Sequence, residues 1–195
     1  MLEIVPLNQD HIPCVAKLHV KKLYKGFLSS LGEKVGRYIY QAIVESDGAF
    51  GFVAVNEGKI IGFVCCAENR GAFYKYALKK HFLGLSWAML PKMLRLCNIR
   101  NAVEKLFHSS RAENILPSAE ILAIAVDEQA RGMGVGRKLI EHSREEFRKR
   151  GIGQIKVITG EAQQAKGFYE TLGFELARQY KRHDALLNVY VAKIF

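Results

Sequence analysis

The chain has 195 residues, of which 49% are hydrophobic and 25% charged, a balance that is typical of globular proteins and excludes wholesale disorder. No run in it reaches the roughly 18 apolar residues that a membrane-spanning helix needs. The formal net charge of +10 is uneven, because residues 69–117 hold nine Lys and Arg against two Asp and Glu, or +7 of the total. This local basicity bears on the ligands or partners of the segment and not on the fold.

The first third of the chain predicts a strand, two helices and a β-hairpin. Apolar periodicity and turn residues place these elements, in order, at 2–6, 8–24, 30–47, 50–55 and 60–67. We expect Ser29 or Ser30 to cap the second helix and Asp47-Gly48 to end it. A turn at residues 56–58 joins the two strands of the hairpin.

Residues 69–117 predict two more helices, at 73–90 and 93–107. We expect them to separate at Pro91, because proline interrupts the helical hydrogen-bond ladder. Each helix has an apolar face to bury, so the segment reads as an ordered insertion and not as a linker.

The last third alternates strands and helices. The expected elements lie, in order, at 121–126, 138–150, 154–159, 162–172, 174–176 and 186–194. The strand at 121–126 is almost continuously apolar, which indicates that it is covered on both faces. Alternating β and α units of this kind predict a three-layer α/β fold.

A glycine-rich turn lies between the buried strand and the helix that follows it. Its sequence is Arg131-Gly132-Met133-Gly134-Val135-Gly136-Arg137. Glycines let the backbone approach a ligand, and the free N–H groups at a helix start attract phosphate oxygens. The turn therefore predicts a pyrophosphate site, although a tight strand-to-helix connection uses the same residues. The spacing differs from the dinucleotide fingerprint, and the Walker lysine is missing.

Two motifs resemble the GNAT superfamily of acetyl-CoA-dependent N-acetyltransferases. They are R-x-x-G-x-G at residues 131–136 and A-x-x-F-Y-x-x-x-G-F at residues 165–174. The resemblance is specific over residues 118–195 and topological over residues 1–68. It implies an acyltransferase that uses acetyl-CoA as co-substrate.

The resemblance also implies the architecture. We expect one GNAT-like domain over residues 1–195, with a mixed sheet in an α/β/α arrangement. The basic helical insertion, at about 69–117, would then lie between strands 3 and 4.

By the same resemblance, particular residues should hold the coenzyme. They are the backbone of Ile124, Ala125 and Val126 for the pantetheine arm, the amides from Arg131 to Arg137 for the pyrophosphate, and the side chains of Arg137, Lys138 and Lys166 for the 3′-phosphate. For those side chains a solvated face is an equal alternative. The chain departs from the family at Ala162, where an asparagine is common, so Gln163 or Gln164 would have to supply that amide.

Attack of an amine on a thioester needs a base for the amine and an acid for the departing thiolate. Tyr169, which we also expect to contact the coenzyme, suits the acid, because a tyrosine pKa of about 10 is close to that of an alkyl thiol. Related enzymes place a tyrosine at this position. For the base we expect Glu120, since partial burial at the strand start would raise its pKa. Glu68 is the second choice, and a water relay is a third route.

The cysteines and histidines predict no additional chemistry. Cys14, Cys65, Cys66 and Cys97 lack C-x-x-C spacing and the six histidines lack ligand spacing, so we expect neither disulfides nor a metal site. Cys65 and Cys66 point to opposite faces of a strand, which disfavours an acetyl-cysteine route. His183 precedes the last strand and would line the acceptor side or face solvent. The first residues lack a leader pattern, and we expect a cytoplasmic protein.

The acceptor and the role of the insertion stay open at this stage. The insertion would be a lid that selects an anionic acceptor, a peripheral contact for anionic lipid or, less favoured, nucleic acid, or a solvated helical pair that buries a homodimer contact. We expect acetyl transfer to a primary amine of a small molecule, such as an amino sugar, by direct attack in a ternary complex. The alternatives are a protein or peptide N-acetyltransferase and a non-catalytic binding module on a GNAT-like body.

Overall fold

The computed structural model describes residues 1–23, 27–93, 116–160, 163–182 and 185–195. Within them, seven strands form one sheet in the order β1-β2-β3-β4-β5-β7-β6. The strands are β1 (Leu2–Pro6), β2 (Ala49–Asn56), β3 (Lys59–Ala67), β4 (Glu120–Val126), β5 (Gln154–Gly160), β6 (Glu175–Arg182) and β7 (Ala185–Lys193). β4 and β5 run parallel and the other neighbours antiparallel, so the sheet is mixed.

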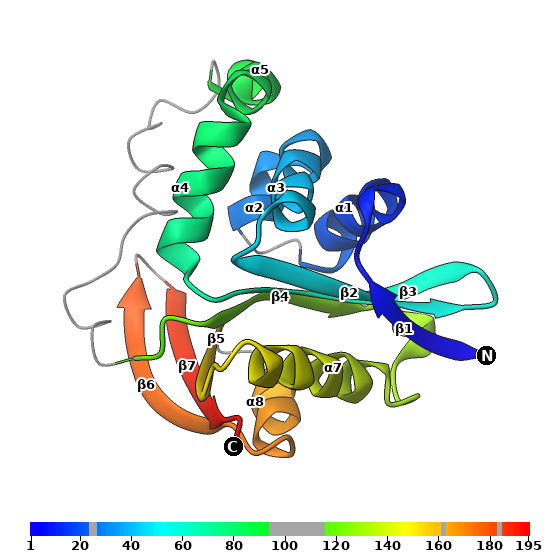
Figure 1. The fold of residues 1–195 in the computed structure, drawn as a ribbon, viewed down its shortest axis with the longest axis vertical. Coiled ribbons are helices and arrows are strands. Elements are labelled where there is room, and N and C mark those ends of the chain that lie inside the picture. Colours follow the sequence, from blue (N-terminus) through cyan, green and yellow to red (C-terminus); the bar gives the residue numbers. More distant parts are fainter. Residues whose placement is uncertain (24–26, 94–115, 161–162, 183–184) are drawn as a thin grey trace.

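Helices cover both faces of the sheet (Figure 1). On one face lie α1 (Ile12–Lys22), α2 (Phe27–Leu31), α3 (Glu33–Glu45), α4 (Arg70–Lys80) and α5 (Phe82–Met93), and on the other α7 (Val135–Lys149) and α8 (Gln163–Glu170). The predicted three-layer α/β/α fold with a mixed sheet is confirmed. α4 and α5 follow β3 in the chain and precede β4, where the insertion was expected.

Each layer boundary has its own apolar core. Phe50, Phe147 and Ile155 belong to the core between the sheet and α7, and Val53 and Phe63 to the core under α1 and α3. Cys65 and Cys66 are fully buried in different cores, as their adjacent places on a strand predict. Burying side chains of this size stabilises the fold by about 1.5–3 kcal/mol each.

The predicted cap of the second helix was wrong. The helix is divided into α2 and α3, and Gly32 is the N-cap of α3 with φ of 83°, a conformation that suits glycine. Ser29 lies inside α2 instead, where its hydroxyl donates a hydrogen bond to the Leu23 carbonyl at 2.6 Å.

The predicted helix break at Pro91 was also wrong. The helices separate at His81, the C-cap of α4, and α5 continues through Pro91. Proline at position 91 removes one hydrogen bond of the helical ladder, and the helix continues for at least two more residues. The second predicted helix, at 93–107, falls almost entirely on residues outside the described ranges.

Candidate active site

The sheet opens between its two parallel strands. β4 and β5 pair over two positions, Glu120 with Lys156 and Ile121 with Val157. β4 continues to Val126 and stays paired with β3 on its other side. Toward β5, residues 124–126 have no strand partner among the described residues. Such an edge can hydrogen-bond an extended ligand as a further strand would. It contains the three residues expected to hold the pantetheine arm.

The glycine-rich turn follows this open edge directly. Gly132 and Gly134 have φ of 79° and 73°, and a Cβ at either would meet no heavy atom within 4 Å. Gly134 is the N-cap of α7 and has no side chain to cap the first-turn amides, which lack intrahelical acceptors. Free amides of this kind and the positive end of the helix dipole favour anions, so the geometry is compatible with the predicted pyrophosphate site.

Gly136 serves a different purpose. A Cβ there would lie 3.1 Å from the Phe168 ring, closer than ordinary packing allows. The glycine therefore lets α7 approach α8, which carries the second motif. The predicted helix start at residue 138 was late, since α7 begins at Val135 and its buried side chain already belongs to the core.

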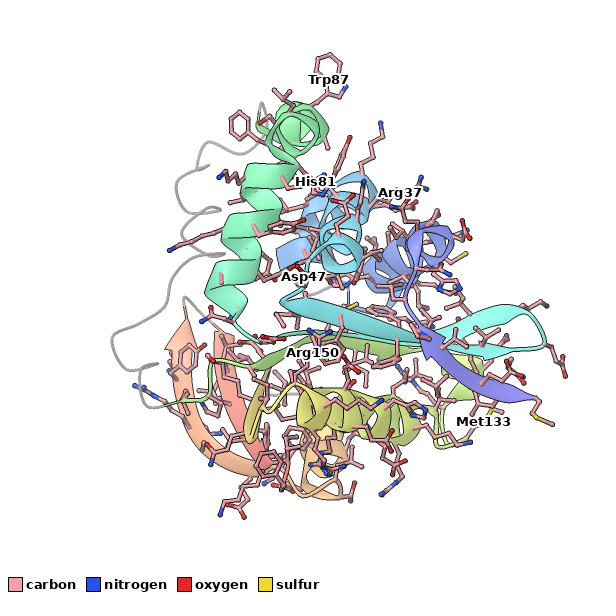
Figure 2. All side chains as sticks on the ribbon, in the orientation of Figure 1. Arg37, Asp47, His81, Trp87, Met133 and Arg150 are labelled. Carbon is pink, nitrogen blue, oxygen red and sulfur yellow. The ribbon has the colours of Figure 1, made fainter. Side chains whose placement is uncertain are left out.

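Basic residues of the glycine-rich turn and its neighbouring helices are exposed. Arg131, Arg137, Lys138 and Lys166 are exposed, as is Met133, which is labelled in Figure 2. Exposure is compatible with contact to phosphate and equally with a solvated face, so the predicted role of these four side chains stays a prediction. The side chains of Gln163 and Gln164, and all of Ala162 and His183, lie outside what the structure describes.

Lys22, the last residue of α1, forms ion pairs with the segment between β4 and the glycine-rich turn. Its ammonium lies 3.5 Å from Asp127 Oδ1 and 3.1 Å from Glu128 Oε1, and its side chain is 5% exposed. Partial burial opposes ionisation of Asp127, but the hydrogen bond from the Gln129 N–H and the charge of Lys22 lower the pKa of that carboxyl. The end of α1 therefore holds residues 127 and 128, just before the glycine-rich turn.

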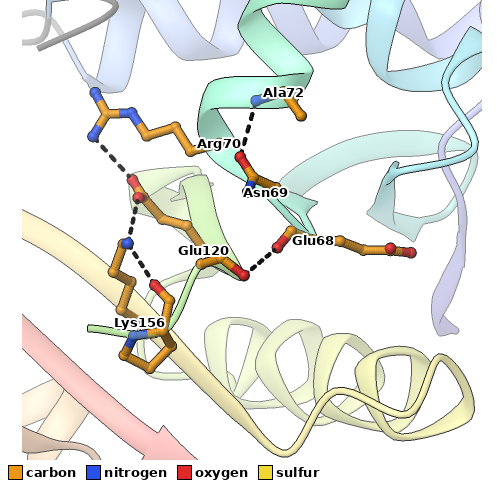
Figure 3. Close-up of polar contacts among 8 residues, drawn as sticks. Glu68, Asn69, Arg70, Ala72, Glu120 and Lys156 are labelled. Carbon is orange, nitrogen blue, oxygen red and sulfur yellow. Dashed lines mark hydrogen bonds and ion pairs between the residues drawn. The ribbon is translucent and has the colours of Figure 1, made fainter. Parts of the chain in front are cut away.

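Glu120 lies between two cations at the end of β4 where the strands still pair (Figure 3). Its residue is 4% exposed, with Oε1 3.4 Å from Arg70 Nη1 and Oε2 3.9 Å from Lys156 Nζ. Lys156, equally buried, also donates a hydrogen bond to the Pro117 carbonyl at 2.5 Å. The cations offset the penalty that burial imposes on a carboxylate.

Arg70 and Lys156 are functional candidates that sequence analysis missed. The parallel register places Lys156 opposite Glu120, and in the sequence Lys156 stands out as a charged residue between an isoleucine and a valine. Arg70 begins α4, whose N-cap Asn69 accepts a hydrogen bond from the Ala72 N–H at 2.9 Å. Because α4 belongs to the insertion, no motif links it to Glu120.

Glu68, the second candidate for the base, is directed elsewhere. Its Oε1 lies 2.8 Å from Arg150 Nη1, and Figure 3 shows the side chain pointing away from Glu120. Arg150 also contacts Glu146 and lies over the Phe50 ring. The structure does not bring the two candidate carboxylates together.

Tyr169 lies on α8 in an aromatic cluster. It is 5% exposed and packs against Phe168, Phe174 and Tyr190, with ring centroids 5.1, 5.5 and 5.9 Å away. Burial, and secondarily Cys66, raises the pKa of Tyr169 above its usual value. Contrary to the prediction from the sequence, the pKa of Tyr169 is therefore not close to that of an alkyl thiol. The phenol stays protonated and can donate a hydrogen bond.

Cys65 and Cys66 are unsuited to nucleophilic attack. Burial raises the pKa of Cys66 to about 12, against the smaller effects of Ser143 and Arg150, and burial also raises the pKa of Cys65. Both thiols stay protonated and therefore inert. Among the described residues, His, Cys, Asp and Glu form no cluster that could hold a metal ion. None of the described helices is both long and apolar enough to cross a bilayer.

A comparison with models of known protein families identifies the family of this chain. The model of the acetyltransferase (GNAT) family matches residues 19–174. The chain belongs to this family. The matched range includes both the glycine-rich turn and the α8 motif, and also the insertion. No curated protein matches the sequence.

Solved structures share the fold. The ribosomal-protein-S18-alanine N-acetyltransferase from Escherichia coli superposes with a TM-score of 0.62 at 17% identity, covering 100% of this chain and 94% of that one. Arabidopsis thaliana NAA60 in complex with acetyl-CoA gives 0.63 at 13% identity, covering 100% and 99%. An IAA acetyltransferase from Bacillus cereus gives 0.54 at 16%, covering 99% of each chain. At such identities the likeness establishes the architecture of this acetyltransferase.

Proposed function

We propose that this acetyltransferase moves the acetyl group of acetyl-CoA to a primary amine of a small molecule, by direct attack in a ternary complex. The observation that carries the proposal is the opening between β4 and β5, which ends at the glycine-rich turn. An extended amide-containing arm fits the open edge of β4, and a diphosphate fits the uncapped start of α7. The acetyl-CoA complex of the Arabidopsis neighbour supports this assignment.

Named residues would hold acetyl-CoA in this arrangement. The backbone of residues 124–126 binds the pantetheine arm, the amides of residues 131–137 bind the diphosphate, and Arg137, Lys138 and Lys166 meet the 3′-phosphate. The bound thioester supplies an acetyl carbonyl activated toward nucleophiles. Two proton transfers then fall to side chains of this chain, one from the amine and one toward the departing thiolate.

Glu120 is the proposed base. An ammonium entering beside Glu120 loses its proton to the carboxylate, and Arg70 and Lys156 hold that carboxylate in place. Positioned general bases typically contribute 10²–10⁴-fold in rate.

Tyr169 is the proposed acid. Its buried phenol donates a hydrogen bond to the departing sulfur, and the raised pKa ensures that the proton is present at neutral pH. Full proton transfer to a thiolate becomes less favourable as the phenol pKa rises. The structure therefore supports stabilisation of the thiolate by hydrogen bonding as the larger part of the role.

Charge indicates the acceptor class. Arg70 brings the insertion into contact with Glu120, and residues 70–93 hold five Lys and Arg with no Asp or Glu. An acceptor that carries an anionic group beside its amine, such as a phosphorylated amino sugar, complements this field. A protein N-terminus is the second candidate, because the Escherichia coli neighbour is named for acetylation of a ribosomal-protein alanine.

An assay of thiol release with acetyl-CoA tests the proposal. The panel contains phosphorylated and unphosphorylated amino sugars, polyamines and peptides with free N-termini. We expect the phosphorylated amino sugars to have the highest kcat/KM, falling with added salt as screening weakens attraction. Turnover confined to peptides would replace the small-molecule acceptor by the second candidate, and no release with any amine would overturn both.

A further inference from the structure

α5 exposes an apolar surface on the outer end of the insertion. Phe82, Leu83 and Trp87 are 63%, 82% and 79% exposed. Figure 2 shows Trp87 pointing away from the body of the protein. Exposed large apolar side chains are ordinary when single, but three on adjacent turns of one short helix mark an interaction surface.

The surface is held firmly by the opposite side of the same helix. Leu85 is 4% exposed and packs in a small core with Leu31 and Val35. Gly84 allows close approach, since a Cβ there would lie 2.5 Å from the Tyr38 ring. α5 therefore presents its apolar side chains from a fixed position on α3.

The connection between α4 and α5 is fixed as well. His81 Nε2 lies 3.1 Å from Glu45 Oε2, and the Tyr76 hydroxyl donates a hydrogen bond to the Glu45 carbonyl at 3.2 Å. Both contacts join α4 to the end of α3. Lys79 and Lys80, which immediately precede His81, are thereby held beside the apolar surface.

Exposed cations accompany this surface. Lys75, Lys79 and Lys80 on α4 are all exposed, and residues 70–93 contain no Asp or Glu. A partner for this region must therefore carry negative charge for the lysines. It must also provide an apolar environment in which the Leu and Trp side chains can be buried away from water. Anionic lipid headgroups above acyl chains meet both requirements.

We propose that Phe82, Leu83 and Trp87, together with Lys75, Lys79 and Lys80, form a membrane-docking surface that binds bilayers containing anionic lipid. The described residues of α5 extend about 18 Å, against a hydrocarbon core of about 30 Å, and one side of the helix packs on α2 and α3, so we place the surface in the interface of the bilayer. Tryptophan favours that depth.

Two other partners fit less well. Nucleic acid would satisfy the lysines but offers little to Leu83. A second copy of this chain would satisfy the apolar side chains, yet a two-fold interface would place the basic surface of one copy near that of the other. Lipid is the partner that uses both features of the surface.

The chain supplies its own reporter, because Trp87 is its one tryptophan. We expect the fluorescence of Trp87 to shift to the blue, and acrylamide to quench it less, when phosphatidylcholine vesicles that contain about 30% phosphatidylglycerol are added. Phosphatidylcholine alone should give a much smaller change, and high salt should reverse most of the effect. An unchanged spectrum with anionic vesicles at low salt would overturn the proposal.

Variants separate the surface from general adhesion. L83E, and separately the pair K79E and K80E, should reduce co-sedimentation with anionic vesicles at least about tenfold without lowering the melting temperature. F195E is the control, because Phe195 is 75% exposed but the C-terminus lies far from α5 in Figure 1. Equal binding of L83E would contradict docking through α5.

The same Trp87 fluorescence measurement distinguishes the alternative partners. A blue shift that grows with protein concentration in the absence of lipid would assign the surface to a second copy. A shift produced by a duplex oligonucleotide and not by vesicles would assign it to nucleic acid. Either result would overturn the membrane proposal, and neither depends on the acetyltransferase reaction.

Discussion

Arg70 Nη1 lies 3.4 Å from Glu120 Oε1, and this contact joins the first residue of α4 to the first residue of β4. The insertion is therefore part of the setting of the proposed base and not an independent appendage. Lys156 approaches the same carboxylate from β5, on the other side. The two cationic neighbours of Glu120 thus come from two segments, α4 and β5, that neither motif includes.

Substitution of Glu120 by Gln keeps the shape of the side chain but removes the proton acceptor. We expect E120Q to lower kcat by about 10²–10³-fold at pH 7. The loss should shrink as the pH approaches the pKa of the amine, since a neutral amine has already lost the proton that Glu120 removes before attack. A pH profile of kcat/KM measures both effects.

E68Q is the matched control, because the Glu68 carboxylate contacts Arg150 and not the Glu120 cluster. It should cost no more than about 1 kcal/mol in folding free energy and leave kcat near the wild-type value. Equal loss of kcat in the two variants would remove the distinction between the carboxylates.

Substitution of Tyr169 by Phe removes a buried hydroxyl and keeps the ring. We expect Y169F to lower kcat tenfold or more while the Kd for acetyl-CoA changes little, because hydrogen bonding to the sulfur matters most as negative charge develops on it. Steady-state kinetics and a binding titration separate the two quantities.

Y190F serves as the control for that variant. The Tyr190 ring packs on Tyr169, and its buried hydroxyl has no hydrogen-bond partner within the described residues. Removing an unsatisfied hydroxyl should leave the melting temperature unchanged or raise it. If Y169F retained full turnover, Tyr169 would have no part in the chemistry.

Gly134 and Gly151 form a matched pair at the two ends of α7. Their φ values are 73° and 72°, and a Cβ at either would meet no atom within 4 Å. Valine at either position should cost about 1–2 kcal/mol in backbone strain. G134V alone should abolish the rise in melting temperature that acetyl-CoA produces, because its side chain occupies the space proposed for the diphosphate. A retained shift in G134V would place the coenzyme elsewhere.

His19 predicts how stability depends on pH. Burial lowers its pKa from 6.5 to about 4, and its Nδ1 is hydrogen-bonded to the Tyr40 hydroxyl. Between these values the unfolded chain binds a proton that the folded chain does not, so stability falls as the pH drops from 6.5 toward 4. The full effect is on the order of 3 kcal/mol.

Urea denaturation at pH 7 and at pH 4.5 measures this dependence. H19Q should reduce the difference between the two free energies of unfolding, whereas H142Q, which changes a partly exposed side chain on α7, should leave it as in the wild type. An unchanged difference in H19Q would show that other groups account for the acid sensitivity.

Sequence alone predicted what depends on local pattern. The run at 121–126 indicated a buried strand, and the three glycines at 132, 134 and 136 indicated a turn into a helix. Both follow from short-range periodicity and backbone preferences. The positions of Cys65 and Cys66 on opposite faces follow from strand geometry in the same way.

The remaining features depend on contacts between distant segments. Nothing near Arg70 in the sequence indicates that it meets a residue 50 positions later. Likewise, the depth of burial that raises the pKa of Tyr169 is a property of how α8 packs on β7 and not of its motif. The helices separate at His81, which contacts Glu45 on α3, and nothing near residue 81 in the sequence indicates that contact.

The account depends most on the binding of a diphosphate at the start of α7. Calorimetric titration of the wild-type protein with acetyl-CoA and with S-acetylpantetheine, which lacks the diphosphate, tests it directly. We expect acetyl-CoA to bind at least about 100-fold more tightly, a difference of about 2.7 kcal/mol. Equal affinity for the two compounds, or no heat with acetyl-CoA at millimolar concentration, would contradict the account.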